Sequence, residues 1–477
     1  MANLLERFLE LEKAFCALKA ELVALKAENA ALKSTIAKLT EENTTLLTEN
    51  AQLKERLGLN SKNSSIPSSK ELHKLKGNKP KSDRKQGGQP GHKGHLRNKA
   101  IPDTIIKIDL DSTECECGGQ ISLLKECYVH QKIEIPEIKP LVTEYHLERG
   151  RCRVCGKRKS SKLPEDVTPD LFGPRVKTVI SALTGFYKNS KREVEAILKD
   201  LFNLEISLGT VSNNEARVSE KCKDNYETIE LELSYSKLLH IDETGHYNKG
   251  KLGWCWLFSS PKIASLIKLT DSRGKKVLEN SVFGANDSIT VTDRYGAYTY
   301  FTQENRQICW SHLARDFERF VHSSNHQVKA LGIHLKQIAY DTFTLRKLLI
   351  EEKIDLRRFW RRAKKLRKRM WYYLKGVANL DNAPHALRVA KNLLKSEEMM
   401  WKFLQDPKVI PMTNNHAEQQ IRHYVVYRKN SYFTQSERGN RFLERVISLY
   451  LTYKQQNLNP VTHLGVFKEL CQIKKIG

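Results

Sequence analysis

No apolar run in the sequence approaches the length of a transmembrane helix, about 20 residues, and no signal peptide opens the chain. Cysteine is sparse, at 10 of 477 residues, which argues against the disulfide framework of a small secreted domain and leaves metal binding or free thiols. Acidic residues are few beside basic ones, 55 against 81, so the formal net charge is +26. We therefore expect a cytoplasmic protein of several domains with a polyanionic partner, either nucleic acid or an acidic membrane surface.

A strict heptad pattern occupies the first residues. Leucine recurs at every seventh position, at Leu4, Leu11, Leu18, Leu25, Leu32, Leu39, Leu46 and Leu53. Three of the other core positions hold Asn29, Asn43 and Asn50, and such residues fix the register of a parallel coiled coil and favour two strands. Charged pairs such as Glu21 with Lys26 attract each other across such a dimer. Residues 1–59 are therefore predicted to form a leucine-zipper-like coiled coil in a homodimer, with a single amphipathic helix packed on its own chain as the alternative.

Residues 60–100 have the composition of a basic flexible linker. They are rich in Ser, Asn, Pro, Gly and Lys, and residues 62–99 hold eleven Lys and Arg against two acids. Such a segment buries too little apolar surface to fold alone, and its charge suits contacts with phosphate; a merely solvated linker is the alternative. Because this segment follows the leucines and contains Pro and Gly, it differs from the basic helix that precedes a zipper in transcription factors.

Two cysteine pairs, each followed by glycine, predict a small zinc-ribbon-like β module over residues 101–165. The pairs are Cys115 with Cys117 and Cys152 with Cys155, and the alternating segments 132–135 and 141–147 lie between them. Four thiolates close a tetrahedral structural Zn²⁺ site. One residue separates the first pair where two are usual, so free thiols in a degenerate ribbon are the alternative. Substitute ligands are available at Cys127, His130 and His146.

Residues 166–230 are predicted to form a helical helix-turn-helix region that binds DNA. An amphipathic helix over 191–202 is followed by a short turn and by a polar helix that begins after Ser207, a good N-cap. This spacing is typical of a helix-turn-helix, with a plain helical hairpin as the alternative. The side chains expected to contact DNA are Arg192, Thr210, Ser212, Asn213 and Arg217.

An acidic residue, Asp242, ends the apolar segment 238–244. A buried acid is costly unless something positive needs it. Its expected partners are Asp293, which follows another apolar segment, and Glu418, at the start of a helix for which Asn414 or Asn415 is the expected N-cap. Carboxylates supply the oxygen ligands that hard cations prefer, so we expect two Mg²⁺ (or Mn²⁺) ions here. Each acid alone also fits a helix or strand cap, and Glu243 is an alternative to its neighbour.

The segments around these acids have the order of a ribonuclease H-like α/β catalytic domain, expected over residues 231–322. A three-stranded antiparallel meander, a short helix, and alternating strands and helices are predicted. The expected strands are 238–244, 253–258, 263–269, 288–292 and 306–310, and the expected helices cover 275–282 and 314–320. This order places the ends of the first and fourth strands, and hence Asp242 and Asp293, side by side.

Residues 323–410 are predicted to be a basic helical insertion, after which residues 411–477 complete the catalytic core. Nine of the thirteen residues 357–369 are Lys or Arg. The charge is expected on every side of the helix, which favours contact with DNA over a solvated face. The residues expected to contact DNA are Arg357, Arg358, Arg361, Arg362 and Lys365, and, beyond Glu418, Arg422, Arg428 and Lys429.

Nearly the whole chain resembles the transposases of insertion sequence 66. The resemblance rests on the leucine-rich start, the paired cysteines, the helix-turn-helix and the segments 60–69, 87–95, 240–244, 292–298, 309–313 and 414–422. It implies a DDE transposase with the triad Asp242, Asp293 and Glu418, and so selects Asp242 over its neighbour. It also implies accessory proteins encoded by the same element. The spacing of Cys115 and Cys117 departs from the family pattern and leaves the zinc open.

The resemblance also covers the element Cys309-x-x-His312, in which we interpret His312 as an active-site neighbour and not as a metal ligand.

Together these features predict a multidomain α+β protein of the bacterial cytoplasm and nucleoid. It would bind the inverted-repeat ends of its element and target DNA, and would cleave and join DNA with a divalent metal. One alternative is a nuclease of the same fold without strand transfer. Another is a DNA-binding regulator without catalysis, which should show a broken triad, whereas all three acids are present.

Overall fold

The computed structural model of the protein describes residues 2–57, 98–124, 128–283 and 288–465. The chain forms two compact units, one of residues 1–72, 170–191 and 211–477 and the other of residues 73–169 and 192–210. Most of the predicted linker, at 58–97, and the alternative zinc ligand Cys127 lie outside the described residues. None of the described helices is long and apolar enough to cross a membrane.

The leucine-rich start is one continuous helix, α1 (Ala2–Leu57). Every heptad leucine whose side chain is described is more than half exposed, from 54% for Leu25 and Leu32 to 72% for Leu11. The helix is confirmed, and its apolar stripe is uncovered within the single chain. The coiled coil and the homodimer stay predictions.

A five-stranded mixed sheet in the order β5-β4-β3-β6-β7 forms the centre of the larger unit. The meander of β3 (Leu238–Asn248), β4 (Lys251–Ser260) and β5 (Ala264–Thr270) is antiparallel, as predicted. β6 (Ile289–Thr292) and β7 (Arg306–Ile308) extend the sheet as parallel strands on the other side of β3. Lys249 and Gly250 join β3 to β4 with φ of 50° and 76°, as a tight two-residue hairpin requires.

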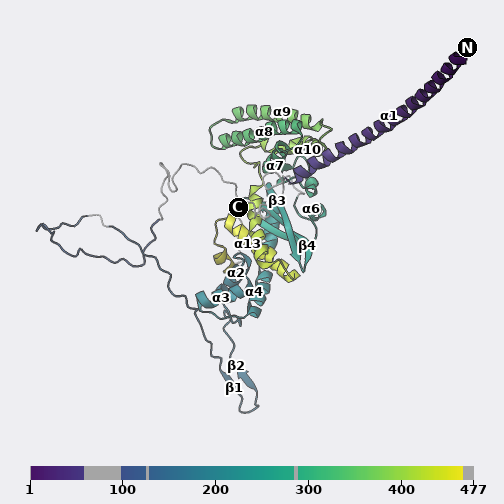
Figure 1. The fold of residues 1–477 in the computed structure, drawn as a ribbon. Helices are drawn as coiled ribbons and strands as arrows, with labels where there is room; N and C mark the ends of the chain where they lie inside the picture. Colours follow the sequence, from purple (N-terminus) through teal and green to yellow (C-terminus); the bar gives the residue numbers. More distant parts are fainter. Residues whose placement is uncertain (1, 58–97, 125–127, 284–287, 466–477) are drawn as a thin grey trace. The chain divides into compact units, whose positions relative to one another are not determined.

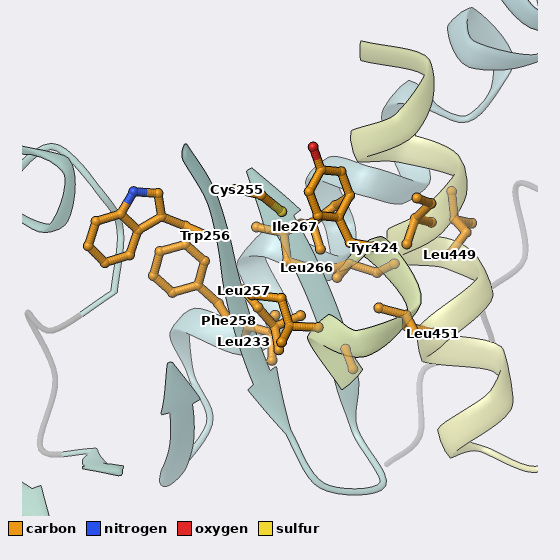
Figure 2. Packing of buried hydrophobic residues seen from close by; sticks show 14 of the residues in the cluster. Leu233, Cys255, Trp256, Leu257, Phe258, Leu266, Ile267, Tyr424, Leu449 and Leu451 are labelled. Atoms are coloured by element: carbon orange, nitrogen blue, oxygen red, sulfur yellow. The ribbon is translucent and has the colours of Figure 1, made fainter. Parts of the chain in front are cut away.

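Apolar side chains cover both faces of this sheet. Leu257 of β4 and its cross-strand partner Ile267 of β5 line one face, and Figure 2 shows Leu449 and Leu451 on α13 (Glu437–Gln455) next to the sheet. On the other face, Phe258 of β4 stacks on Phe283 with 4.2 Å between ring centroids. Figure 1 shows α13 beside the strands. The remaining elements of this core are α2 (Pro174–Gly185), α4 (Leu208–Lys221), α5 (Lys223–Ser234), α6 (Lys276–Glu279), η2 (Gly296–Tyr300), α12 (Asn415–Ser431) and α14 (Pro460–Gly465).

The predicted insertion is helical and has a core of its own. Its elements are α7 (Trp310–Val321), α8 (His326–Ile350), α9 (Leu356–Ala378), α10 (Pro384–Lys395), α11 (Glu397–Met400) and η3 (Lys402–Leu404). Trp310 is fully buried and meets Trp401 edge to face, with 4.8 Å between ring centroids. The basic helix α9 buries Phe359, Ala363 and Met370 along one side. The expectation of charge on every side was therefore wrong, because the apolar residues at helical spacing pack into this core.

The chain changes from strand to helix earlier than predicted after β7. The strand was expected to run to Trp310 and the helix to begin at Ala314, whereas β7 ends at Ile308 and α7 begins at Trp310. The backbone N–H of Cys309 still donates to Thr292 of β6, but that of Trp310 donates to Met412. The sheet therefore ends here, and the burial of the Trp310 side chain fixes the first turn of α7.

The smaller unit contains the short hairpin of β1 (Arg149–Arg151) and β2 (Arg158–Ser160) and most of α3 (Lys191–Phe202). The alternating segments 132–135 and 141–147 were expected to be strands, and the structure shows neither helix nor strand there. A strand needs a neighbour for its backbone groups, and neither segment has a ladder partner within the part of the chain that the structure describes. Their apolar side chains are exposed, Leu141 to 95%.

Candidate active site

The parallel pairing of β3 with β6 brings the first two acids together. Leu238 pairs with Ile289 and His240 with Val291, and the same register two residues further sets Asp242 opposite Asp293. Burial raises the pKa of Asp242 well above its usual value of 3.8, and the negative charges of Glu243, Asp293 and Glu418 raise it further. Asp242, Asp293 and Glu418, from here on the acidic triad, therefore share one electrostatic site.

Asn414 fixes the start of α12, and hence Glu418, against β3. Its side-chain amide donates to the carbonyl of Ile241 at 2.7 Å, and its Oδ1 lies 2.9 Å from Nδ1 of His240. Its backbone N–H donates to Sγ of Cys309 at 3.1 Å. Asn414 does occupy the predicted N-cap position, but its side chain makes no capping hydrogen bond, because β3 uses it. It therefore positions the third acid one turn into the helix.

Glu418 lies beside two side chains of α7. Its Oε1 is 3.9 Å from Nδ1 of His312 and 3.7 Å from the guanidinium of Arg315. Burial and the charge of Arg315 lower the pKa of His312, and the charges of Asp293 and Glu418 oppose that shift. His312 is therefore neutral near pH 7, and it lies beside an acid of the predicted site. Arg315 was not predicted, although its spacing of three residues puts it on the same helix face as His312.

Glu243 is a buried structural anchor and not a bystander. Its side chain is 1% exposed, and burial and the negative charge of Asp293 raise its pKa. Arg273 donates to its Oε1 through Nε at 2.9 Å and Nη2 at 2.6 Å, and the hydroxyl of Tyr298 donates to Oε2. The guanidinium of Arg273 also lies over the ring of Tyr295, 3.7 Å from its centroid. No sequence motif pointed to these partners.

Asp293 is held by the backbone at the end of β6. Its Oδ1 accepts from the N–H of Tyr295 at 2.8 Å. The buried Arg306 donates to the carbonyl of Asp293 at 2.7 Å and to Oγ1 of Thr292 at 2.9 Å. Burial lowers the pKa of Arg306 to about 10, so the side chain stays charged at neutral pH and balances the negative triad.

The triad fits hard divalent cations such as Mg²⁺. It supplies only oxygen donors, its mutual repulsion favours a bound cation, and Oε1 of Glu418 is buried without a hydrogen-bond partner. One oxygen from each acid does not fall within 4.8 Å of the other two in the described structure.

The four cysteines predicted to bind zinc form two separate pairs. Backbone N–H groups lower the pKa of Cys117 and of Cys152, through Gly119 in the first pair and through Cys155 and Val154 in the second. Such donors favour a thiolate in each pair. No three of the four sulfur atoms lie within 4.8 Å of one another in the described part of the chain. The zinc site stays a prediction.

The two predicted helices of the helix-turn-helix are α3 and α4, and Ser207 caps α4, since its Oγ accepts from Thr210 N–H at 3.2 Å. Arg192 and Asn213 are exposed, and Arg217 is exposed and paired with Asp170 at 2.9 Å. Ser212 was expected to contact DNA, but its Oγ accepts from Lys191 and from Arg438. The tertiary fold of the larger unit therefore uses this hydroxyl.

Arg428 was also expected to contact DNA, and the structure corrects this. Its guanidinium donates to Oγ1 of Thr244 at 2.7 Å and to the carbonyl of Gly245, so it holds the end of α12 on β3. Arg422 and Lys429 on the same helix are exposed. On α9, all five residues expected to contact DNA are exposed: Arg357, Arg358, Arg361, Arg362 and Lys365.

Comparison with known proteins extends this picture. A family model described as "Transposase IS66 family" matches residues 191–441, more than half of the chain and all three acids of the triad. A second model, a family of unknown function (DUF6444), matches residues 17–98. "Uncharacterized protein y4hP" of Sinorhizobium fredii is 23% identical over 411 residues, which cover 77% of this chain and 72% of that protein. The chain therefore belongs to the IS66 family of transposases.

Proposed function

We propose that the protein is a DDE transposase that cleaves DNA at the inverted-repeat ends of its insertion sequence and transfers the freed strand to target DNA. The observation that carries this proposal is the convergence of the acidic triad from β3, the end of β6 and the first turn of α12. A sheet of three antiparallel strands followed by two parallel ones supports a ribonuclease H-like core. We assign residues 231–322 and 411–477 to this core and residues 323–410 to an insertion.

The triad would hold two Mg²⁺ or Mn²⁺ ions, which when bound activate the attacking oxygen and stabilise the leaving one. In the first step water attacks the scissile phosphodiester, loses its proton, and the 3′-oxygen leaves as the element's 3′-hydroxyl. In the second step this hydroxyl attacks a target phosphodiester and displaces the target's 3′-oxygen. His312 lies beside Glu418 with 3.9 Å between Nδ1 and Oε1, and Arg315 lies where a substrate phosphate can meet it.

The remaining modules would bring DNA to this site. The outer face of α9, the exposed residues of α3 and α4, and Arg422 and Lys429 supply positive charge for phosphate contacts. Zn²⁺ would join the two cysteine pairs of residues 101–165 into one structural site. The exposed stripe of α1 would pair with a second copy of the chain. Accessory proteins encoded by the same element would be further partners, and the protein would act at the bacterial nucleoid.

The test is a cleavage and joining assay with full-length protein, Mg²⁺ and DNA that carries the element's end. Asp242→Asn keeps the size of the side chain and removes its charge, so we expect cleavage to fall at least about a hundredfold. The matched control is Asp271→Asn, which neutralises an exposed acid after β5. Equal cleavage by both variants would exclude Asp242 from the site. Cleavage without a joined product would identify a nuclease, and specific DNA binding without cleavage a regulator.

A further inference from the structure

The element Cys309-x-x-His312 contains a buried thiol that the proposed reaction does not use. Cys309 is the N-cap of α7 and is fully buried, and His312 lies one turn further along the same helix. Sγ of Cys309, a ring nitrogen of His312 and a carboxylate oxygen of Glu418 all lie within 4.8 Å of one another. Within the part of the chain that the structure describes, no other three His, Cys, Asp or Glu side chains meet in this way.

Two atoms of this cluster lack the partners that buried polar atoms usually have. Nδ1 of His312 and Oε1 of Glu418 are both buried without a hydrogen bond, and they face each other at 3.9 Å. Buried polar atoms in native proteins are nearly always satisfied, so an unsatisfied pair points to a missing ligand. A cation between the two atoms would satisfy both.

The thiol completes a donor set with a preference among metals. A sulfur, an imidazole nitrogen and a carboxylate oxygen suit Zn²⁺ and other thiophilic ions, whereas Mg²⁺ requires oxygen. Burial raises the pKa of the Cys309 thiol, and the N–H of Asn414, which donates to its Sγ at 3.1 Å, opposes that rise.

The size of the cluster is close to that of a zinc site. Zinc bonds of about 2.0–2.3 Å in tetrahedral geometry set ligand separations of about 3.3–3.7 Å, so the three atoms need to approach by about 1.5 Å at most. Arg315 lies 3.7 Å from the same oxygen of Glu418 and is itself partly exposed. Arg315 and a cation are therefore alternative partners of Glu418, and the arginine would turn outward when the ion enters.

We propose that Cys309, His312 and Glu418 form a second cation site, selective for Zn²⁺, that withdraws Glu418 from the acidic triad and arrests DNA cleavage. The occupant shares one carboxylate with the site for hard cations, so the two occupations exclude each other. The binding half of this proposal stands on geometry alone. The inhibitory half rests on the proposed function.

Binding is tested with Co²⁺, which replaces Zn²⁺ and gives a thiolate-to-metal absorption band. The parent is the full chain with serine at the four exposed cysteines Cys115, Cys117, Cys152 and Cys155. We expect the band in the parent and in its Cys222→Ser control, which removes a buried thiol outside the cluster. Cys309→Ser should lack the band and bind Co²⁺ at least about tenfold more weakly.

A band that persists in Cys309→Ser would overturn the site. If Cys309→Ser fails to fold, Glu418→Gln decides instead, because it keeps the thiol and should still weaken Co²⁺ binding at least about tenfold. Unchanged affinity in that variant would equally reject the cluster.

Inhibition is tested by adding Zn²⁺ to the Mg²⁺-dependent cleavage assay. Because both metals need Glu418, the Zn²⁺ concentration that halves cleavage should rise with Mg²⁺, and it should rise at least about tenfold in Cys309→Ser. Equal sensitivity of Cys309→Ser and Cys222→Ser would overturn the inhibitory half. Absence of cleavage in every variant would instead contradict the proposed function, and the Co²⁺ result would still decide whether the site exists.

Discussion

Two neighbouring acids of β3 have opposite roles because successive side chains of a strand point to opposite faces. Asp242 faces the rest of the triad, where nearby carboxylates raise its pKa. Glu243 faces Arg273 and Tyr298, which satisfy both of its oxygens. One carboxylate is therefore left for a cation, whereas the other is neutralised within the fold.

The first prediction concerns Glu243. Glu243→Ala removes the buried oxygen that accepts from two nitrogens of Arg273, so we expect the free energy of unfolding to fall by about 2–3 kcal/mol, less than for a fully buried pair because Arg273 is 35% exposed. Glu243→Gln keeps an acceptor oxygen for the two nitrogens of Arg273 and should lose less stability. Urea denaturation of both variants measures the difference. A loss under about 0.5 kcal/mol, the usual effect of a surface substitution, would mean that the pair does not contribute to stability.

At the same scale, sequence reasoning found the triad but not the groups that hold it. Local pattern predicted Asp242 and Asp293 at strand ends and Glu418 at a helix start. Asp293 does follow β6 and Glu418 lies in the first turn of α12, whereas Asp242 lies within β3, which continues to Asn248. Asn414 and Arg306 could not be found in this way, because each acts on residues that only the folded sheet brings near. Asn414 bonds Ile241, 173 residues away in the sequence.

At the scale of elements, periodicity predicted α3, the meander and the helical insertion, and failed where tertiary contacts decide the outcome. The strand assignment of 306–310 ignored the burial of Trp310, which belongs to the helical core. Alternation in 141–147 predicted a strand that has no neighbour to pair with in the described chain. The hydrophobic periodicity of a segment predicts whether it would be a helix or a strand. A neighbouring element in the fold decides whether that helix or strand forms.

The contact of α13 with β5 yields a prediction for pH. Oε1 of Glu444 accepts from Leu269 N–H at 2.6 Å, and burial raises the pKa of Glu444 to about 7. The folded state thus holds this proton more tightly than the unfolded chain, whose carboxyl has the ordinary value of 4.5. The stabilisation from this group is complete below pH 4.5 and is lost as the pH rises through 7, by about 3–4 kcal/mol at most.

Glu444→Gln keeps the acceptor for Leu269 and removes the titration. We therefore expect the variant to gain stability relative to the natural protein between pH 5 and pH 8, roughly the interval over which the linkage acts. Chemical denaturation across that range measures the gain. Glu227→Gln on the exposed side of α5 is the control and should show no such trend. A constant difference at all pH values would contradict the shifted pKa.

The outer face of α9 carries a further prediction. Replacing Arg361, Arg362 and Lys365 with glutamine removes three exposed charges and leaves the buried face intact. If all three contact phosphate, the slope of log affinity against log salt should fall by about 2.7, at about 0.9 for each contact. Binding to element-end DNA at several salt concentrations measures the slope. The same replacement at Lys251, Lys262 and Lys276, exposed on the sheet's loops and α6, is the matched control, and an equal effect there would reject α9 as an interface.

At the scale of the whole molecule, the +26 charge and the apolar stripe of α1 have separate consequences. Positive charge binds polyanions without specifying the number of subunits. The stripe favours an assembly, because a helix of 56 residues with leucines more than half exposed leaves apolar surface that a second helix could cover. Transposition joins two ends of one element, and a dimer brings two active sites to them.

The dimer is tested by sedimentation of full-length protein at micromolar concentration. The natural chain should sediment at twice its mass of 55.0 kDa. Leu25→Lys with Leu32→Lys puts two charges into the predicted seam, where a buried unpaired charge is too costly for the helices to stay together, and should give monomers. Ala20→Lys with Ala27→Lys adds the same charge on the outer side of the same heptads and should stay dimeric. Monomers in the natural protein, or dimers in the leucine variant, would show that the stripe of α1 has another partner, and each subunit would then have to find its DNA end without the zipper.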